Sequence, residues 1–270
     1  MADPCCVHPI SSVGKTSHKK RFKGGCFIMM TFASLAILAR ILLGLSVTYL
    51  VATISEVIWH RHVYHASSRT RRFWARYPRY FNFFLNHHYR HTIVHHGLTF
   101  RVDHITQFKD LEAKAEIDRI VSLKNDKLIH RDGYGLSPSW ITGLSGLVTF
   151  NLTVAPVLPI LYWFAGPWAF WGGLPVLALS PMLTMMTHPY LHQHHGEPSA
   201  KPSLIMRFVM RTWYFKMLWR HHFLHHKYPS SNFNFLLGGD HLLGTYRRPD
   251  EKDLIDMEAF GIPFERANII

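Results

Sequence analysis

Cysteine is scarce in this chain, and its placement excludes several classes of protein. The sequence has three cysteines in 270 residues, namely Cys5, Cys6 and Cys26, all near the N-terminus. They cannot link distant segments, and no Cys-x-x-Cys pair exists to bind zinc or to exchange thiols. The sequence therefore excludes a zinc finger and a thioredoxin-like redox site.

Charged residues are absent from one long stretch, which indicates membrane crossings. No Asp, Glu, Lys or Arg occurs from Gly133 to Thr187, a run that exceeds two crossings at about 20 residues each. A second apolar segment, Cys26 to Trp59, is interrupted by Arg40 and, near its end, by Glu56. It follows basic residues as a signal peptide would, but it is too long and has no clear cleavage site. We expect a multi-pass integral membrane protein.

Acidic residues are few, 17 against 30 Lys and Arg, so the formal net charge is +13. The basic residues are spread over the non-membrane segments without a recognition motif, which argues against nucleic-acid binding. Fourteen Lys and Arg lie between Arg61 and Arg131, and the positive-inside rule assigns such a segment to the cytoplasm. The expected location is the endoplasmic reticulum membrane or a bacterial inner membrane, with this segment on the cytoplasmic face.

The apolar segments divide the chain into a basic, disordered N-terminus (1–25), a membrane domain (26–248) and a polar C-terminal tail (249–270). Residues 140–187 predict two crossings that turn near Ala165 to Pro167. Residues 26–59 form either one long helix or two short helices that meet near Arg40 to Gly44. Five basic residues precede Cys26 and favour the cytoplasm, which requires an even number of crossings before the first histidine cluster. We therefore expect two short helices and about four crossings in total.

Histidine is the residue that this chain has in excess. Sixteen of the 21 histidines fall into four clusters beside apolar runs. The clusters read HRHVYH (His60, His62, His65), HHYRHTIVHH (His87, His88, His91, His95, His96), HPYLHQHH (His188, His192, His194, His195) and HHFLHH (His221, His222, His225, His226). Neutral imidazole is a common ligand for iron, zinc and copper. The clusters predict a polynuclear metal site with nitrogen ligands.

The spacing within the clusters suggests which histidines share a metal. Side chains three or four residues apart lie on one face of an α-helix, which applies to His188 and His192. It also applies to the pairs His91/His95, His222/His225 and His222/His226. Adjacent histidines, as in His95/His96 and His225/His226, point about 100° apart and could serve two metals. His60 and His65, five apart, suit two metals better than one, unless the helix unwinds there.

Two further segments surround the clusters. Residues 69–84 are basic and aromatic (RTRRFWARYPRYFNFF) and suit the membrane headgroup region. Residues 104–130 predict an amphipathic surface helix. Because the hairpin at 140–187 returns the chain to the side that it left, all four clusters lie on one membrane face and can converge. A convergent site favours catalysis over a metal-buffering loop.

These boxes resemble those of the membrane fatty acid hydroxylase superfamily, the histidine-box dimetal oxygenases that include sterol desaturases and lipid hydroxylases. The resemblance covers about residues 40–248. EVIWHRHVYH is similar to the first box, HTIVHH to the second, HPYLH to the third and HHFLHH to the last. The closing segment NFNFLLGGDHLLGTYRRP is also similar. The second box has three residues instead of the more usual two before its His-His pair.

The resemblance implies an all-α membrane protein with four membrane helices and a cytosolic helical cap that holds a dimetal site. The ligands that it implies are His60, His65, His91, His95, His96, His188, His192, His222, His225 and His226. The longer second box leaves His88 as an alternative to His91. His62, His87, His194 and His221 are expected outside the ligand set.

Asp240 is a candidate catalytic residue that either orients a ligand imidazole or caps a turn at Gly238-Gly239. Glu56 is either a second carboxylate partner or a helix-end charge.

The implied activity is O2-dependent oxidation of a C–H bond in a membrane lipid by two ferrous ions, with zinc as a possible substitute metal. Hydroxylation and desaturation are both open. The chain has no HPGG motif of a fused cytochrome b5 domain, so electrons are expected from a separate donor, namely cytochrome b5, a ferredoxin or a reductase. The alternative is a non-enzymatic membrane metal-binding or transport protein. It is disfavoured because the central crossings contain no histidine before His188.

Overall fold

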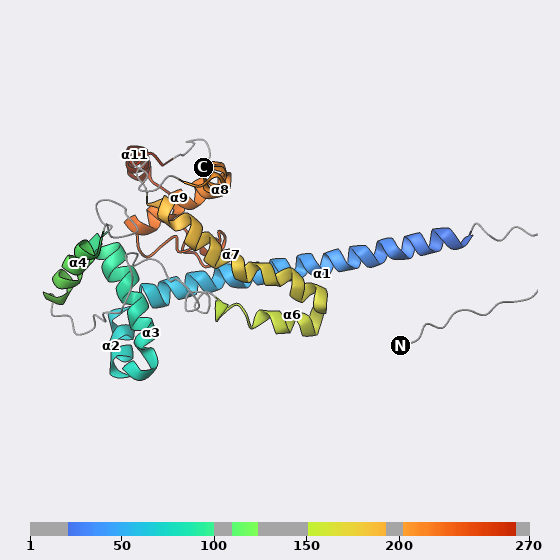
Figure 1. Cartoon of the computed structure of the whole chain (residues 1–270), viewed down its shortest axis with the longest axis horizontal. Helices are drawn as coiled ribbons and strands as arrows, with labels where there is room; N and C mark the ends of the chain where they lie inside the picture. Colours follow the sequence, from blue (N-terminus) through green and yellow to red (C-terminus); the bar gives the residue numbers. More distant parts are fainter. Residues whose placement is uncertain (1–20, 100–109, 124–150, 193–201, 263–270) are drawn as a thin grey trace, which may run out of the picture.

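The computed structural model describes residues 21–99, 110–123, 151–192 and 202–262, and the regular elements named in these residues are all helices (Figure 1). In chain order they are α1 (Arg21–Trp59), η1 (His60–Tyr64), α2 (Ser68–Arg76), α3 (Pro78–His88), η2 (Tyr89–Thr99), α4 (Leu111–Leu123), α6 (Val157–Ala165), α7 (Pro167–Leu191), α8 (Leu204–Arg211), α9 (Trp213–Lys227), α10 (Gly239–Leu242) and α11 (Glu251–Ala259). η1 and η2 are π-helical. The predicted all-α class is confirmed for the described part of the chain.

The first apolar segment forms one continuous helix of 39 residues, α1, so the expected turn near Arg40 to Gly44 was wrong. Gly44 instead allows the backbones of α1 and α7 to approach closely. A Cβ at Gly44 would overlap the backbone of Ala169, and one at Gly172 would overlap the backbone of Ile41. Small residues of this kind permit close helix–helix packing in membranes. The glycine therefore marks a contact between α1 and α7 and not a break.

Two helical stretches are long and apolar enough to cross a membrane, Phe32–Tyr64 and Pro167–His188. Large apolar side chains such as Leu38, Leu42 and Trp171 project from them into the surroundings. The turn predicted near Ala165 to Pro167 is confirmed at Gly166, between α6 and α7, whose φ of 82° suits glycine. α6 has only nine residues, about 14 Å of helix, and residues 140–150 lie outside the described part. The structure thus supports two candidate crossings, and the predicted four would need the turn that α1 lacks.

The remaining helices gather beyond one end of α1 and α7 and form what we call the head region (Figure 1). Its largest core joins α8, α9 and α11 through buried Phe215, Leu218, Leu224 and Met257. α11 lies in the segment that was expected to be a polar tail. It begins with a capping box between Asp250 and Asp253.

The predicted surface helix is described from Leu111 to Leu123 as α4, shorter than the expected 104–130, whose ends lie outside the described residues. It packs on η2, where Ala113 and Ile117 contact the buried pair Tyr89 and Val94. The Tyr89 hydroxyl donates a hydrogen bond to Asp118, 3.1 Å away. α4 is therefore a surface helix that supports the π-helix carrying three of the histidines.

Candidate metal centre

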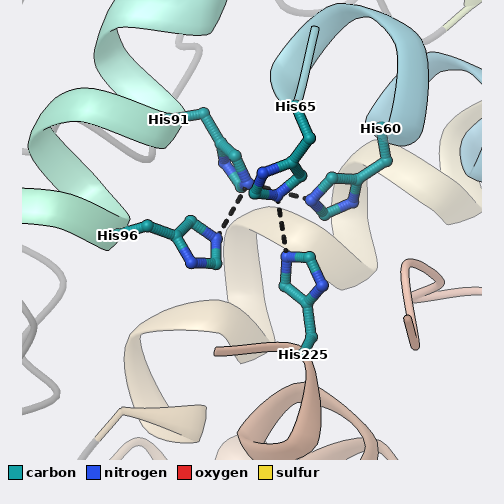
Figure 2. A group of neighbouring side chains, drawn as sticks. All are labelled: His60, His65, His91, His96 and His225. Atoms are coloured by element: carbon teal, nitrogen blue, oxygen red, sulfur yellow. Dashed lines mark hydrogen bonds between the residues drawn. The ribbon is translucent and has the colours of Figure 1, made fainter. Parts of the chain in front are cut away.

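The structure brings the ten histidines that the resemblance implied as ligands into two groups of five. In each group the ring nitrogens that could bind a metal lie within 4.8 Å of one another. The first group, drawn in Figure 2, is His60, His65, His91, His96 and His225. The second group is His95, His188, His192, His222 and His226. Each group could hold a metal ion.

Two π-helical turns assemble the first group. A π-helix bonds residues five apart, so side chains at i and i+5 come together along one face. η1 begins at His60, and both His60 and His65 belong to the first group. The expectation that these two suit separate metals assumed an α-helix and was wrong, whereas the alternative, a helix that departs from α-helical winding at its end, agrees with η1. η2 likewise pairs His91 with His96, whose Nε2 atoms lie 3.1 Å apart, so the α-helical pairing of His91 with His95 was also wrong.

α-Helical spacing assembles most of the second group. His188 on α7 and His192, which directly follows α7, are four apart, with Nε2 atoms at 3.1 Å. His222 and His226 are four apart on α9, also at 3.1 Å. The two helices meet between His192 and His222, at 2.8 Å. The prediction that i, i+4 pairs face one way is confirmed for these two helices, whereas His225, three residues from His222, belongs to the other group.

Adjacent histidines divide between the groups, as their angular separation predicted. His95 joins the second group and His96 the first, while His225 joins the first and His226 the second. The rings of His96 and His226 stack at 4.1 Å between centroids, so the two groups adjoin. The two groups are therefore neighbours that could together hold two metal ions, and η2 and α9 each contribute histidines to both.

Distances within the groups suit a metal ion bound by imidazoles. In the first group Nε2 of His60 lies 2.9 Å from Nε2 of His91, and Nε2 of His65 lies 3.2 Å from that of His225. Nitrogens bound about 2.1 Å from one ion at right angles would be about 3 Å apart. Figure 2 shows the five rings turned toward a common centre from η1, η2 and α9. The donor set therefore fits a transition metal.

Burial keeps these imidazoles neutral. It lowers the pKa of His91, His96, His222 and His226 well below the ordinary value, and repulsion from neighbouring imidazoles lowers it further. Burial also lowers the pKa of His65 to about 2. A metal ligand must be the neutral ring, and each of these rings keeps one unprotonated nitrogen with a free lone pair at neutral pH.

Backbone carbonyls fix the orientation of two rings in the first group. The Nδ1–H of His60 donates to the carbonyl of Phe233 at 2.8 Å, and the Nδ1–H of His225 donates to the carbonyl of Ser231 at 2.8 Å. A carbonyl can only accept, so Nε2 of each ring carries the lone pair. That tautomer directs the Nε2 atoms toward the metal position.

Asp240 is fully buried and holds the segment that carries these carbonyls. Its carboxylate accepts the backbone N–H of Phe233 at 3.0 Å and of Asn234 at 2.9 Å. It also accepts from the ring of His221 at 2.9 Å and from the hydroxyl of Thr245. These hydrogen bonds lower the pKa of Asp240 although burial opposes them. The aspartate thus acts on the ligands through the loop at 231–234, and its imidazole partner is His221, outside both groups.

Residues of α1 and α9 also form hydrogen bonds with this loop, at residues 234–236. Glu56 accepts the backbone N–H of Leu236 at 2.9 Å, and the side-chain amide of Asn234 donates to the carbonyl of Thr53 at 2.8 Å. The Tyr214 hydroxyl donates to the carbonyl of Phe235. Glu56 is therefore a partner of the loop backbone. Sequence reasoning did not find this loop as a support, since its contacts are made by backbone groups.

The other histidines lie outside the two groups. His88, the alternative to His91, donates from Nδ1 to the carbonyl of Tyr64 at 2.7 Å, and His91 stands in the first group. His62 is exposed, and His87 is buried against Phe83. His8, His18, His104, His130, His194 and His195 lie outside the described residues.

The chain matches no protein-family model, no curated protein and no solved structure. The resemblance to the membrane fatty acid hydroxylase superfamily therefore remains a prediction from the histidine boxes. The geometry of the two histidine groups does not depend on that resemblance.

Proposed function

We propose that the chain is a membrane-bound dimetal oxidoreductase that uses O2 to oxidise an unactivated C–H bond of a lipid, as in fatty acid or sterol-type hydroxylation. The observation that carries the proposal is the pair of adjoining five-histidine groups at the ends of two apolar helices. Desaturation of a lipid by the same centre is the alternative outcome.

The donor set is compatible with iron, the metal that the proposed chemistry needs. Ten neutral imidazoles and no carboxylate make up the two groups, and imidazole suits iron, copper and zinc. One ion would be held by each group. When bound, two iron ions would supply O2 activation and oxidation of the C–H bond. Zinc is the expected contaminant after expression in a foreign host.

The chain's own residues prepare the site for this chemistry. Buried rings such as His95, His188 and His222 exclude water from the second group. The carbonyls of Phe233 and Ser231 hold the tautomers of His60 and His225. The exposed apolar surfaces of α1 and α7 would bring lipid to the ends of the helices from which these histidines project.

Arg40 supports a membrane position in which the histidines lie at one surface. A Cβ at Gly166 would lie 3.3 Å from Nη1 of Arg40, so this guanidinium is beside the turn between α6 and α7. From Arg40 to His60 α1 rises about 30 Å, the thickness of the hydrocarbon core. The turn and Arg40 would lie at one surface and the head region at the other, where the basic content of residues 61–131 favours the cytoplasm.

Metal analysis and lipid analysis together test the proposal. The protein, purified anaerobically in nanodiscs and loaded with ferrous iron, should hold close to two ions per chain. Membranes of cells that make it should contain lipids with one added oxygen or two fewer hydrogens. The double variant His8→Ala/His18→Ala serves as the control, because neither residue is in a cluster. A stoichiometry near one, or an unchanged lipid profile with two irons bound, would overturn the proposal.

Cysteine labelling tests the topology separately. Cys5 and Cys6 report the N-terminus, and an introduced Lys252→Cys reports the exposed start of α11 in the head region. We expect position 252 to react from the cytoplasm. Labelling of Cys5 and Cys6 from the same side would support an even number of crossings before His60, whereas labelling from the opposite side would support a single crossing by α1.

A further inference from the structure

The hairpin of α2 and α3 is packed against the end of the first candidate crossing. Trp59 is the last residue of α1, and its ring lies 6.3 Å from that of Phe83 and 5.7 Å from that of Phe84 on α3. Trp74 of α2 and Leu85 of α3 are buried together in one apolar cluster. Figure 1 shows α2 and α3 side by side where α1 ends. The hairpin is therefore held next to the place where α1 would leave the membrane.

The outer side of the hairpin exposes aromatic side chains. Phe73, Tyr77, Tyr80 and Phe83 are between 41% and 73% exposed, and the rings of Phe73 and Tyr77 lie 5.5 Å apart. Apolar side chains that gather on one exposed surface mark a contact with a partner or a membrane. Aromatic rings with a polar edge are enriched where a bilayer meets water. The exposed rings therefore suit the headgroup region of a bilayer.

Arginines lie beside these rings on the same hairpin. Arg69, Arg72 and Arg76 are exposed on α2, where spacings of three and four place them on one face, and Arg79 is exposed on α3. None of the four forms an ion pair with another residue of the described chain. No Asp or Glu occurs from 57 to 102, so this segment carries no charge that would neutralise them. Basic residues directly after a membrane helix attract an anionic leaflet.

We propose that the outer side of the α2–α3 hairpin is a binding surface for anionic phospholipid headgroups of the leaflet from which α1 emerges. The guanidinium groups of Arg69, Arg72 and Arg76 donate hydrogen bonds to headgroup phosphates and carboxylates, while the rings of Phe73 and Tyr80 enter the apolar region below. This surface depends on the membrane position of α1 and on no step of the oxidation chemistry. The hairpin joins η1 to η2, so lipids bound to it hold the segments of the first histidine group at the membrane surface.

Lipid selectivity tests the proposal. The full chain is placed in phosphatidylcholine membranes with a trace of spin-labelled phosphatidylserine or phosphatidylcholine, and the immobilised fraction of each label reports its affinity for the protein surface. The parent should prefer phosphatidylserine by about threefold or more, and salt should weaken this preference. Arg72→Glu/Arg76→Glu should lower the preference at least about twofold.

The matched control reverses two exposed basic residues near the start of α11, as Arg248→Glu/Lys252→Glu, and should keep the preference of the parent. An equal affinity of the parent for both lipids, or the same loss in both variants, would overturn the proposal. If circular dichroism shows that the glutamate variant of α2 has lost helix, Arg72→Gln/Arg76→Gln takes its place and should also lower the preference.

A nitroxide at position 80 locates the surface itself. The label is attached to Tyr80→Cys in a chain with Cys5, Cys6 and Cys26 replaced by serine. The proposal expects relaxation mainly by O2 dissolved in the bilayer, whereas a label on Lys252→Cys in α11 should relax with a water-soluble nickel complex. Relaxation of position 80 mainly by the nickel complex would place the hairpin in water, where its arginines would meet an acidic macromolecule, and would overturn the proposal.

Discussion

The two histidine groups reach the same ligand number by different construction. The second group rests on α-helical i, i+4 pairs from α7 and α9, which any continuous helix provides. The first group needs two π-helical segments and a loop far along the chain, whose carbonyls at Ser231 and Phe233 fix two of its rings. It also borders a surface cavity at His65. The comparison teaches that both groups join distant segments, but four of the five histidines in the second group come as α-helical i, i+4 pairs, whereas the first group depends on π-helical turns and a loop.

Removing one ligand from each group gives the largest expected effect. His225→Ala should remove the first metal and His226→Ala the second, because the two neighbours serve different groups. Each variant should lose C–H oxidation, since the chemistry needs both ions, while retaining close to one bound ion per chain. Metal analysis by mass spectrometry and product assays on membranes with matched protein levels check this.

The same two variants also test whether the two groups bind their metals independently. Loss of both metals in both variants would mean that the groups form one cooperative site. His18→Ala is the matched control, because it replaces a histidine outside every cluster and should leave metal content and turnover unchanged.

Asp240→Asn should act on the first metal only. The carboxylate holds the backbone of Phe233 and Asn234, and therefore the carbonyl that orients His60. Partners that orient metal ligands typically contribute about 10- to 100-fold in metal affinity. We expect a weakening of that size for the first ion and almost none for the second, measured by stepwise competition with a chelator. Asp240→Glu, which keeps the charge but moves it, should be intermediate.

Equal weakening of both ions in Asp240→Asn would show that the aspartate stabilises the whole head region. Circular dichroism on the metal-free variant separates that case, because a local change in the loop leaves the helices folded.

The sequence predicted which histidines form the site better than it predicted how they divide between the two groups. All ten implied ligands lie in the two groups, because identity and clustering along the chain are visible in the letters. The pairing of His60 with His65, and of His91 with His96, was not predictable, since it depends on π-helical turns that no local pattern in the sequence indicated. The role of the loop at 231–237 was not predictable for a related reason. The loop orients the histidines through backbone carbonyls, which every residue has.

The membrane part shows a similar limit. The run of apolar residues identified both candidate crossings, yet Gly44 was assigned to a turn that is absent. A glycine within an apolar run permits either a bend or close packing, and only the position of Ala169 on α7 decides between them. The buried face of α11 was missed because two apolar side chains, Leu254 and Met257, were too few to outweigh the charges around them.

Asp253→Asn should affect both groups alike and more weakly. Asp253 lies 2.6 Å from Lys227, the last residue of α9, and accepts from Tyr228 at 2.9 Å. Burial raises its pKa, but these partners outweigh burial and leave the pKa below its ordinary value. A depressed carboxyl pKa stabilises the fold above the unfolded pKa of about 3.9, and the gain is lost as pH falls through the folded value.

The parent should therefore lose thermal stability more steeply than Asp253→Asn on acidification below about pH 4, and the variant should melt several degrees lower at pH 7. Thermal unfolding of the metal-free proteins in one detergent at both pH values checks this. A parallel acid response in parent and variant would contradict the assignment.

Glu56→Gln should have the smallest effect on metal binding, and it should act on the first group alone. Glu56 accepts the backbone N–H of Leu236 and so connects α1 to the loop that orients the first group. Glutamine keeps an acceptor oxygen at the same distance, so we expect less than about threefold weaker binding of the first ion. Glu56→Ala removes the acceptor and should weaken it further, again without touching the second ion. Glu258→Gln, an exposed change on α11, is the control. A larger effect of Glu56→Gln than of Asp240→Asn would show that the charge of Glu56, and not its hydrogen bond to the loop, supports the first metal position.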